Sequence, residues 1–344
     1  MIVFLLPEAD LRGGTYNKCL GLVNNTNHNS RILIYSKTST SHKNQFVDHT
    51  EKKGFINNLF CINKYIKKNE VKLVICHFFR CQIFAFLLKM LNPNLKIIRA
   101  YVGVTDLTST KKIIENFTSS FFDRFIFVSH FVKKIRKPLF ANKKKIHVIP
   151  NGTLIDTDGR NHKRKKHLKL LCIKGLTKDM EIEKLINCVG KYSENLNITL
   201  DIIGDGPYRK ELEEKVTKLK ASRIINFLGY VANASKHIKN YDIYVHPTSR
   251  EGFGIAILEA MNAGVPIIVP KKGGASEIIE NDTQGLQINF NSRKEWTAAI
   301  EQLKKHRIRN SMAHNAKILL KNRYSIDSMT TNYEEVINGI LKKE

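Results

Sequence analysis

The feature that most restricts the fold of this chain is a regular alternation of short apolar runs with longer amphipathic segments. Runs that are apolar throughout are typical of parallel strands with helices covering both faces. Strands are predicted for ten runs, at residues 2–6, 31–35, 72–76, 96–101, 124–129, 168–173, 199–204, 225–229, 241–247 and 265–270. The alternation therefore predicts an α/β protein with parallel sheets.

The apolar runs fall into two groups that meet near residue 150. Residues 150–167 are polar, turn-rich and charged, and we interpret them as a linker between two doubly wound domains. The length of 344 residues agrees with two domains. We predict a first domain over residues 1–150 and a second over residues 151–324. An amphipathic helix over residues 325–344 is expected to pack back on the first domain.

Basic residues strongly outnumber acidic ones. The chain has 57 lysines and arginines and 31 acidic side chains, which gives a formal net charge of +26. Residues 1–150 hold 25 basic and 8 acidic side chains, a net charge of +17, which leaves +9 for the rest. This excess predicts an anionic partner such as a nucleotide or a phospholipid surface. A nucleic-acid partner is not expected, because the sequence has no module with interleaved stacking aromatic residues.

Cysteine usage and hydropathy predict a cytoplasmic protein. The six cysteines form no CxxC pair and no cysteine–histidine ligand spacing, which argues against a zinc module or a disulfide scaffold. The N-terminal apolar run is too short for a signal peptide. The most apolar stretch, residues 81–91, is too short to cross a bilayer. Peripheral attachment to the cytoplasmic face of the inner membrane remains compatible with this pattern.

The most informative motif is HPTSREGFGIAILEAMNAGVPIIVPKKGGASEII, residues 246–279. Its first glycines lie at a strand-to-helix turn, where the helix N-terminus offers free N–H groups to a phosphate. Glu251 precedes the turn and Glu259 lies inside the helix, about 12 Å further on at the helical rise. Carboxylates repel phosphates but bind hydroxyls, so this pair suits the two sugars that flank a diphosphate. The alternative is a buried βαβ unit with a surface glutamate and a glycine cap.

Within this stretch, REGFGIAILEAMNAGVP (250–266) resembles the Glu-x7-Glu signature of glycosyltransferase family 4, the retaining GT-B enzymes also called glycosyl transferases group 1. Five other segments resemble the same family in the same order, namely PEADLRGGTYNKCLGL (7–22), RFIFVSHFVKK (124–134), VIPNGTLID (148–156), LDIIGDGPYRKELEE (200–214) and GGASEII (273–279). The resemblance covers nearly the whole chain. It implies a hexosyltransferase with two Rossmann-like domains facing a central cleft, the acceptor on the first and the nucleotide sugar on the second. No cofactor is implied.

The resemblance also implies roles for single residues. Glu251 would contact the donor hexose, and Glu259 would contact the ribose of the nucleotide. The hexose and the diphosphate would be held by the backbone amides of Gly252, Phe253, Gly254 and Ile255. Gly13 and Gly14 would let a loop of the first domain approach the diphosphate, although a simple turn after the first strand explains these two glycines equally well.

The sequence departs from the family at the cations that neutralise the departing diphosphate. The family usually supplies an arginine, and a lysine five residues later, after the first strand of the second domain. This chain offers Lys174 and Lys178, which are four residues apart. Lysine keeps the charge but loses bidentate geometry, and either lysine could instead be a solvated surface residue.

A second departure concerns the acceptor side. Many family members have a histidine after the fourth strand of the first domain, near the transferred sugar, but residues 97–107 contain none. Tyr101, Arg99 and Asp106 are candidates for that space. His77 also follows a strand, where ligands bind in such sheets, although a lone histidine is more often structural.

One acidic pair resembles a metal-binding motif. Asp156 and Asp158 form a DxD, which elsewhere holds a metal–nucleotide pair. They follow the PNG segment rather than a strand of the donor domain. We interpret them as linker and expect no metal.

These observations predict transfer of a hexose or N-acetylhexosamine from a nucleotide diphosphate sugar, with UDP favoured over GDP, to a glycan hydroxyl. The process would be synthesis of a bacterial surface polysaccharide such as capsule or O-antigen. Residues 130–147 mix basic and apolar side chains and could rest on anionic lipid, in which case the acceptor would be lipid-linked. A helix exterior with a basic loop explains this segment equally well. The alternatives are a nucleotide-sugar epimerase of GT-B fold and a non-catalytic basic membrane-binding protein.

Overall fold

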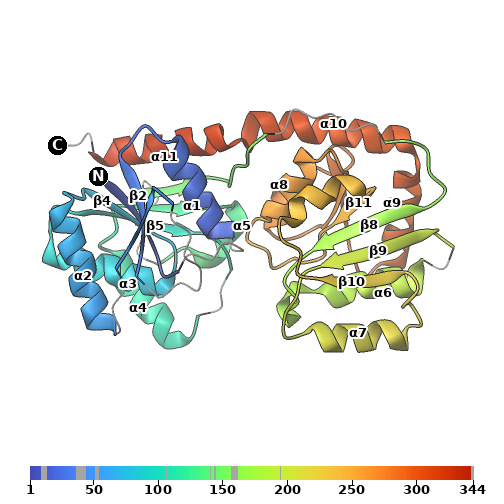
Figure 1. Cartoon of the computed structure of the whole chain (residues 1–344), viewed down its shortest axis with the longest axis horizontal. Helices are drawn as coiled ribbons and strands as arrows, with labels where there is room; N and C mark the ends of the chain where they lie inside the picture. Colours follow the sequence, from blue (N-terminus) through green and yellow to red (C-terminus); the bar gives the residue numbers. More distant parts are fainter. Residues whose placement is uncertain are drawn as a thin grey trace. The chain divides into compact units, whose positions relative to one another are not determined.

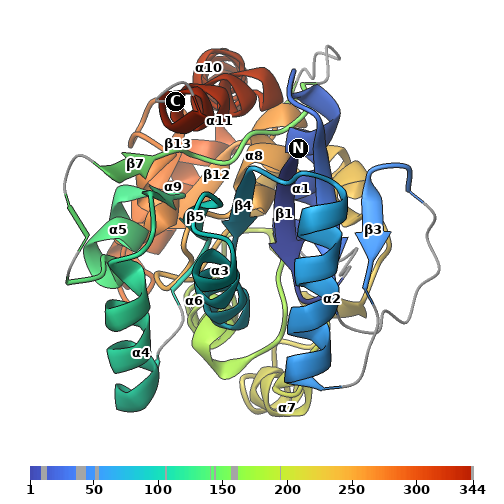
Figure 2. The same cartoon turned by 90° about the vertical axis from the view of Figure 1, so that its left-hand side faces the viewer.

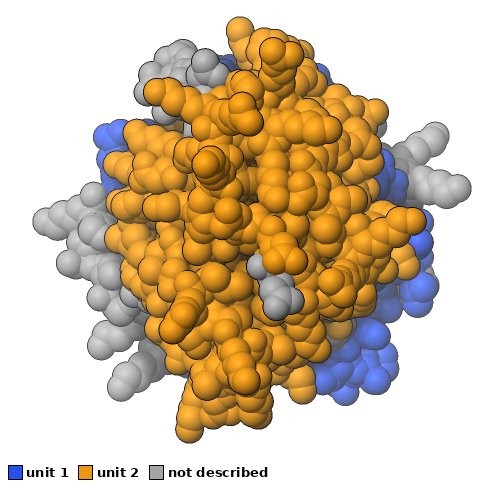
Figure 3. Space-filling model, turned by 90° about the vertical axis from the view of Figure 1, so that its right-hand side faces the viewer, with its two compact units in different colours: residues 1–152, 326–344 blue, residues 153–325 orange. Residues whose placement is uncertain are grey.

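The computed structural model divides the chain into two compact units. It describes residues 1–8, 14–35, 44–50, 54–104, 107–139, 141–142, 145–155, 162–193 and 195–341. The first unit consists of Met1–Gly152 together with Ile326–Glu344, and the second is Thr153–Ser325 (Figure 3). The chain therefore leaves the first unit near residue 152 and returns to it for its last helix.

The first unit is built on a parallel sheet of seven strands. These are β1 (Ile2–Leu6), β2 (Ser30–Ile34), β3 (Val47–His49), β4 (Leu73–Cys76), β5 (Lys96–Tyr101), β6 (Arg124–Phe127) and β7 (Ile146–Val148). Their order across the sheet is β3-β2-β1-β4-β5-β6-β7, and neighbouring strands pair in parallel. The central strands β1 and β4 are buried at every position because helices cover both faces of the sheet.

Helices cover the sheet of the first unit on both sides (Figures 1 and 2). They are α1 (Gly14–Asn25), α2 (Phe55–Lys68), α3 (Phe79–Leu91), α4 (Ser109–Ser119), α5 (His130–Arg136) and α11 (Ile326–Leu341). In Figure 1, α1 and α11 lie above the sheet, and α2, α3 and α4 lie below it. Tyr333 and Ile337 of α11 share one apolar core with Cys19 and Leu22 of α1.

The second unit has a parallel sheet of six strands with the same kind of topology. The strands are β8 (Leu168–Ile173), β9 (Ile198–Ile203), β10 (Ile225–Gly229), β11 (Ile243–Val245), β12 (Ile267–Pro270) and β13 (Gly285–Ile288). Their order is β10-β9-β8-β11-β12-β13, again parallel throughout. The α-helices of this unit are α6 (Ile182–Tyr192), α7 (Arg209–Lys218), α8 (Ile255–Asn262), α9 (Arg293–Lys304) and α10 (His306–Arg323). Buried Trp296 of α9 packs in the main core of the unit.

Each sheet has a point where the direction of strand order reverses. In the first unit this switch point lies between β1 and β4, and in the second it lies between β8 and β11. The loops that follow these two strands diverge at the carboxyl edge of the sheet and leave room for a ligand. The two switch points are therefore where ligand-binding side chains are expected.

The prediction of two doubly wound parallel α/β sheets is confirmed, and all ten predicted strands are present. The sequence analysis missed β3, β7 and β13. Each of the three lies at an edge of its sheet. An edge strand has only one neighbour, so it does not need the continuous apolar run that marks a central strand. The helix expected over residues 325–344 is present as α11, which belongs to the first unit.

Candidate functional site

The switch point of the second sheet brings together a lysine, a glutamate and a histidine. Lys174 directly follows β8, and His246 directly follows β11, the strand that pairs with β8. Glu251 lies in the loop between β11 and α8. Its carboxylate forms an ion pair with the Lys174 ammonium group, and its Oε2 lies 3.8 Å from His246 Nε2. Three side chains from two loops thus converge at one place.

Lys174 is held in a largely dry environment. Its side chain is 10% exposed, while that of Glu251 is 28% exposed, so the glutamate faces solvent more than the lysine does. Burial lowers the pKa of Lys174 to about 8, although the charges of Cys172 and Asp179 act in the opposite direction. The lysine therefore stays mainly protonated at neutral pH, and only a modest rise in pH removes its charge.

His246 is buried beneath the glycine turn. A Cβ atom added to Gly254 would lie 3.4 Å from His246 Cε1. Neither ring nitrogen has a hydrogen-bond partner among the residues that the structure describes. Burial, followed by the charge of Lys174, holds the pKa of His246 well below its usual value. The ring is therefore neutral at pH 7, and its charge does not compete with Lys174 for the carboxylate. The sequence analysis did not single out His246, although its position at a strand end was a usable signal.

The glycine turn before α8 is fixed by a second loop. Gly254 has φ = 99°, a left-handed conformation that favours glycine, and it caps α8 without a side-chain hydrogen bond. The amide of Gly274 donates a hydrogen bond of 3.0 Å to the Glu251 carbonyl oxygen. A Cβ on Gly274 would collide with the carbonyl oxygen of Gly252. The two loops can approach this closely only because glycine lacks a side chain.

The first turn of α8 presents backbone amides rather than side chains. Helix geometry leaves the N–H group of Ile255, the first residue of α8, without a partner inside the helix. Phe253 is 3% exposed, and its ring packs edge-on against Tyr324 with 5.9 Å between the ring centroids. Its side chain therefore anchors the turn in the core, and only its amide is available to a ligand.

The two remaining predicted residues of the second unit lie in different surroundings. Glu259 is half-buried within α8, where burial raises its pKa, and its charge acts on buried Tyr244. Lys178 is exposed in a short 3₁₀ helix, Lys178–Met180, and its charge acts on Glu183. Glu251 forms its ion pair with Lys174 and lies near His246, and Lys178 takes no part in these two contacts.

A further glutamate that the sequence analysis missed supports the loop after β11. Glu181, at φ = 56°, accepts hydrogen bonds from the amide and the hydroxyl of Ser249, the latter at 2.7 Å. Burial opposes ionisation of Glu181, but hydrogen bonds from Lys184 and Ser249 outweigh it and lower the pKa. The ionised carboxylate thus ties the start of α6 to the loop that carries Glu251.

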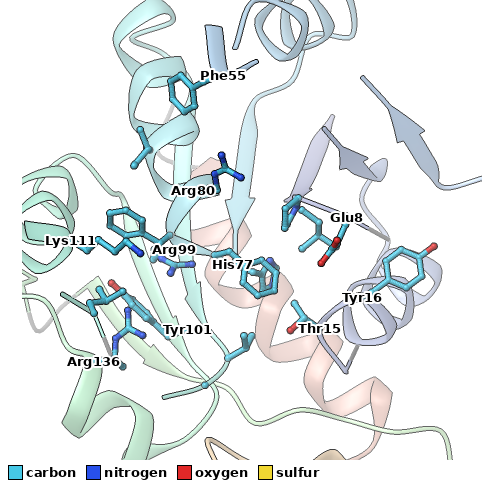
Figure 4. A pocket seen from close by; sticks show the side chains of 18 residues that line it. Glu8, Thr15, Tyr16, Phe55, His77, Arg80, Arg99, Tyr101, Lys111 and Arg136 are labelled. Carbon is cyan, nitrogen blue, oxygen red and sulfur yellow. The ribbon is translucent and has the colours of Figure 1, made fainter. Parts of the chain in front are cut away.

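The switch point of the first unit opens into a pocket of about 800 Å³ (Figure 4). Its lining includes residues at the carboxyl ends of three strands: Leu6, Pro7 and Glu8 at the end of β1, His77 and Phe78 after β4, and Tyr101, Val102 and Gly103 at the end of β5. Figure 4 shows Arg99, Tyr101, Lys111 and Arg136 gathered on one side, with Glu8, Thr15 and Tyr16 across from them. This pocket therefore occupies the position that the topology favours for a ligand.

Three of the predicted acceptor-side residues line this pocket. They are His77, Arg99 and Tyr101, whereas Asp106 lies outside the described residues. Gly14 begins α1, whose next residue, Thr15, also lines the pocket. Gly13, Asp156 and Asp158 lie outside the described residues.

His77 is buried in this pocket wall and belongs to its uncharged part. Its ring stacks on Phe4, with 6.3 Å between the ring centroids, and its Nε2 lies 3.7 Å from the Cys19 sulfur. Burial, and then the charges of Lys18 and Arg99, keep the pKa of His77 well below its usual value. His77 is therefore neutral at physiological pH.

The described residues form neither a metal site nor a membrane-spanning helix. Within the ranges that the structure describes, no group of three or more histidine, cysteine or acidic side chains has an arrangement that could hold a metal ion. None of the described helices is both long and apolar enough to cross a lipid bilayer.

Two protein-family models match the chain. The model described as Glycosyltransferase Family 4 matches residues 36–157, and the model described as Glycosyl transferases group 1 matches residues 156–318. The second match contains all the residues that form the Lys174 site. The two matches adjoin one another close to the division between the structural units.

Curated relatives match parts of the chain. The GtfA subunit of the UDP-N-acetylglucosamine–peptide N-acetylglucosaminyltransferase of Streptococcus agalactiae is 33% identical over 147 residues, covering 42% of this chain and 28% of that protein. The capsular polysaccharide biosynthesis glycosyltransferase CapM of Staphylococcus aureus is 26% identical over 171 residues, covering 49% and 45%. The chain thus spans less than half the length of these curated relatives in the matched regions.

A solved structure extends the likeness to both units. The crystal structure of Anabaena Alr3699/HepE in complex with UDP and glucose matches with a TM-score of 0.83, covering 98% of this chain and 99% of that chain at 16% identity. At this identity the likeness shows a shared fold. It confirms the predicted GT-B architecture.

Proposed function

This chain belongs to the glycosyltransferases that combine a family 4 domain with a group 1 domain, and we propose that it transfers a sugar from a nucleotide diphosphate to a glycan hydroxyl. The sugar is a hexose or an N-acetylhexosamine, and the transfer retains its anomeric configuration. UDP is the favoured nucleotide. The compared proteins support this choice, since one is named for UDP-N-acetylglucosamine and another was solved with UDP.

The ion pair of Lys174 and Glu251 beside the N-terminus of α8 carries the proposal. The amides of residues 252–255 and the positive end of the helix dipole suit a diphosphate. Lys174 adds a positive charge where the departing diphosphate becomes more negative. Glu251 and Glu259 are carboxylates, so they serve as hydrogen-bond acceptors for the hydroxyls of the donor hexose and the ribose.

Donor binding on this proposal requires the ion pair to exchange partners. Lys174 leaves the Glu251 carboxylate for a phosphate oxygen, and the freed carboxylate accepts hydrogen bonds from sugar hydroxyls. His246 lies 3.8 Å from Glu251 but is neutral, so it does not form an ion pair that would compete for the carboxylate during this exchange. The pair thus keeps both groups in position and neutralised before the donor arrives.

Retention does not require a nucleophile from the protein. The acceptor hydroxyl attacks the sugar from the side of the leaving group, and an oxygen of the departing diphosphate takes the hydroxyl proton. The bond between the anomeric carbon and the diphosphate breaks as the new glycosidic bond forms. The protein contributes by stabilising the diphosphate and by orienting the sugar. Lys178 is exposed near Glu183 and is the second cation that we assign to the diphosphate. To reach the diphosphate, the segment that carries it, Lys178–Met180, would have to move.

The acceptor on this proposal is a lipid-linked glycan of a bacterial surface polysaccharide, and it binds at the first unit. The match to a capsular polysaccharide glycosyltransferase supports this process. The pocket at the β1/β4 switch point holds three of the acceptor-side candidates, His77, Arg99 and Tyr101. The protein acts on the cytoplasmic face of the membrane, where nucleotide sugars are made.

An exposed apolar and basic surface on α2 and α4 supports membrane contact; we call it the lipid-facing surface. It comprises Ile56, Phe60 and Lys64 of α2 and Ile113 and Phe117 of α4, two helices that each pack against α3, and its apolar members are 60–69% exposed. Both helices lie on the same side of the sheet as α3 (Figure 1). Apolar side chains with lysines beside them are typical of helices that lie at an anionic bilayer surface.

A donor screen tests the proposed function. The full chain is incubated with UDP-glucose, UDP-N-acetylglucosamine, UDP-galactose and GDP-mannose, and release of the nucleoside diphosphate is measured without acceptor. We expect slow hydrolysis of one UDP-sugar, which Glu251→Gln abolishes and Glu280→Gln, at an exposed glutamate outside the site, leaves unchanged. Conversion of the donor to an isomeric sugar nucleotide would identify an epimerase instead. No saturable binding of any nucleoside diphosphate would rule out both enzymes.

A further inference from the structure

The pocket of the first unit carries an excess of positive charge. Arg80, Arg99 and Lys111 line it together with Arg136, whereas Glu8 is the one acidic residue among the lining residues described. Arg136 is neutralised by an ion pair with Glu115 at 2.8 Å. The other three cations have no carboxylate within ion-pair distance among the residues that the structure describes. The pocket is therefore prepared for an anion.

Among these cations, Arg99 gives the strongest evidence for an anionic ligand, because it is almost completely buried, with 3% exposed. Its Nε donates to Gln82 Oε1 at 3.0 Å, and its Nη1 donates to the carbonyl oxygens of Cys76 and Ala100 at 3.3 and 3.2 Å. These acceptors are neutral, so they fix the guanidinium group without balancing its charge. A buried charge without a counter-charge is costly, and an anionic ligand in the pocket would remove that cost.

Tyr101 adds an unused hydrogen-bond donor at the same place. It is 2% exposed, and its hydroxyl has no hydrogen-bond partner in the described part of the chain. Its ring stacks on Phe127 at 4.7 Å, and the guanidinium carbons of Arg99 and Arg136 lie 4.6 and 5.4 Å from its ring centroid. Burial raises its pKa, so the hydroxyl keeps its proton. A neutral hydroxyl beside two guanidinium groups is suited to an oxyanion.

One part of the pocket lining is apolar, which a free anion would not need. Phe55 and Phe78 line it and are each 40% exposed, and Phe79, Ile83 and Leu107 lie in the same wall. Phe55 is the first residue of α2, and the next residue, Ile56, belongs to the lipid-facing surface. The helix that contributes Phe55 to the pocket therefore also carries part of the surface that we assign to the bilayer.

We propose that this pocket binds a phosphate or diphosphate group that is attached to an apolar chain, with Arg99, Tyr101 and Lys111 on the phosphate and Phe55 and Phe78 on the chain. The proposal rests on the proposed function, since it names the part of a lipid-linked acceptor that the protein recognises. In such an acceptor the phosphate joins the lipid to the first sugar. Specificity for the acceptor then comes from the linkage as well as from the glycan.

Binding of small prenyl compounds tests this site without any donor. Isothermal titration calorimetry on the full chain compares geranyl phosphate, geraniol and inorganic phosphate. We expect geranyl phosphate to bind about tenfold or more tightly than either of the others, because only it satisfies both parts of the pocket. Equal binding of geranyl phosphate and geraniol would overturn the anion site. If inorganic phosphate bound as tightly as geranyl phosphate, the pocket would be a site for free phosphate, and the proposal of an amphiphilic ligand would be wrong.

Variants locate the binding to this pocket. Tyr101→Phe removes one hydroxyl and is expected to weaken geranyl phosphate binding about tenfold, and Lys111→Ala about threefold. Lys112→Ala is the matched control, since Lys112 is the exposed neighbour of Lys111 and does not line the pocket. Unchanged affinity in both Tyr101→Phe and Lys111→Ala would place the ligand elsewhere. Donor hydrolysis is measured on the same preparations, so loss of the donor reaction and loss of prenyl phosphate binding are distinguished.

Discussion

Lys174 and Glu251 are 77 residues apart in the sequence, yet their side chains form an ion pair at the switch point of the second sheet. The lysine follows β8 and the glutamate follows β11, and pairing of these two strands brings the residues together. The contact joins the cation needed for a diphosphate to the carboxylate needed for a sugar.

Replacement of Lys174 by alanine should abolish most transfer. The side chain is positioned to stabilise the charge that develops on the departing diphosphate, and loss of one such donor reduces the rate by about 100-fold to 1000-fold. We expect kcat to fall by this factor in Lys174→Ala, measured with the donor that the screen identifies. Lys169→Ala removes an exposed lysine from β8 itself and should retain full activity. Equal activity of the two variants would contradict the role of Lys174.

Activity should decline as the pH rises through about 8. Burial lowers the pKa of Lys174 to about 8 in the free enzyme, so its positive charge is present below that pH and lost above it. The pH profile of kcat/KM reports groups of the free enzyme, and it should show this alkaline limb. Lys174→Arg keeps its charge in alkaline solution, so whatever activity it has should lose the limb. If the unmodified chain and Lys174→Arg showed the same alkaline decline in kcat/KM, the decline would belong to a group other than Lys174.

Replacement of Gly274 by alanine should weaken both the fold and the donor site. The added methyl group meets the carbonyl oxygen of Gly252 and forces apart the two loops that frame Glu251. We expect a loss of about 1–3 kcal/mol in the free energy of unfolding, together with a higher KM for the donor. Thermal denaturation and initial rates measure the two effects.

Gly339 provides the control for this substitution. It lies exposed in α11, and a Cβ there would meet no atom within 4 Å. Gly339→Ala should therefore raise the stability by up to about 1 kcal/mol. An unchanged donor KM in Gly274→Ala would show that the loop contact does not shape the site.

Mutation of the lipid-facing surface should weaken membrane binding. Ile56→Ser and Phe60→Ser remove two exposed apolar side chains from α2 without touching the core. In sedimentation with phosphatidylglycerol vesicles, we expect the double variant to pellet several-fold less than the unmodified chain. Binding of both proteins should fall at high salt, because lysines contribute. Leu228→Ser, at an exposed position of the second unit, should pellet normally. Failure of the unmodified chain to pellet at low salt would reject the membrane proposal.

The sequence predicted the central strands and the glycine motif because both are local signals. A strand such as β1 is apolar at every position, and a motif such as residues 251–259 is read within one stretch of chain. The edge strands β3 and β7 were missed because each is three residues long and none of their residues is fully buried. β13 was missed although three of its four residues are buried, because its sequence GLQI contains a glycine and a glutamine and has no continuous apolar run.

The arrangement of the side chains could not be predicted in the same way. Pairing of Lys174 with Glu251, and of Glu181 with Ser249, depends on which strands and helices are neighbours in space. The unsatisfied hydroxyl of Tyr101 depends on burial by Phe127 and two arginines. Sequence spacing contains no information on either. The family resemblance supplied candidate residues, and the geometry adds what each of them contacts.

The position of α11 has a consequence for how the chain is made. This helix completes the apolar core over α1, yet the whole of the second unit is synthesised before it. During translation the core of the first unit therefore remains uncovered over α1 until α11 has been synthesised. The second unit, Thr153–Ser325, is one continuous segment and can fold before that. Vectorial synthesis thus reverses the order expected from the sequence, and the unit that begins the chain is the last to be finished.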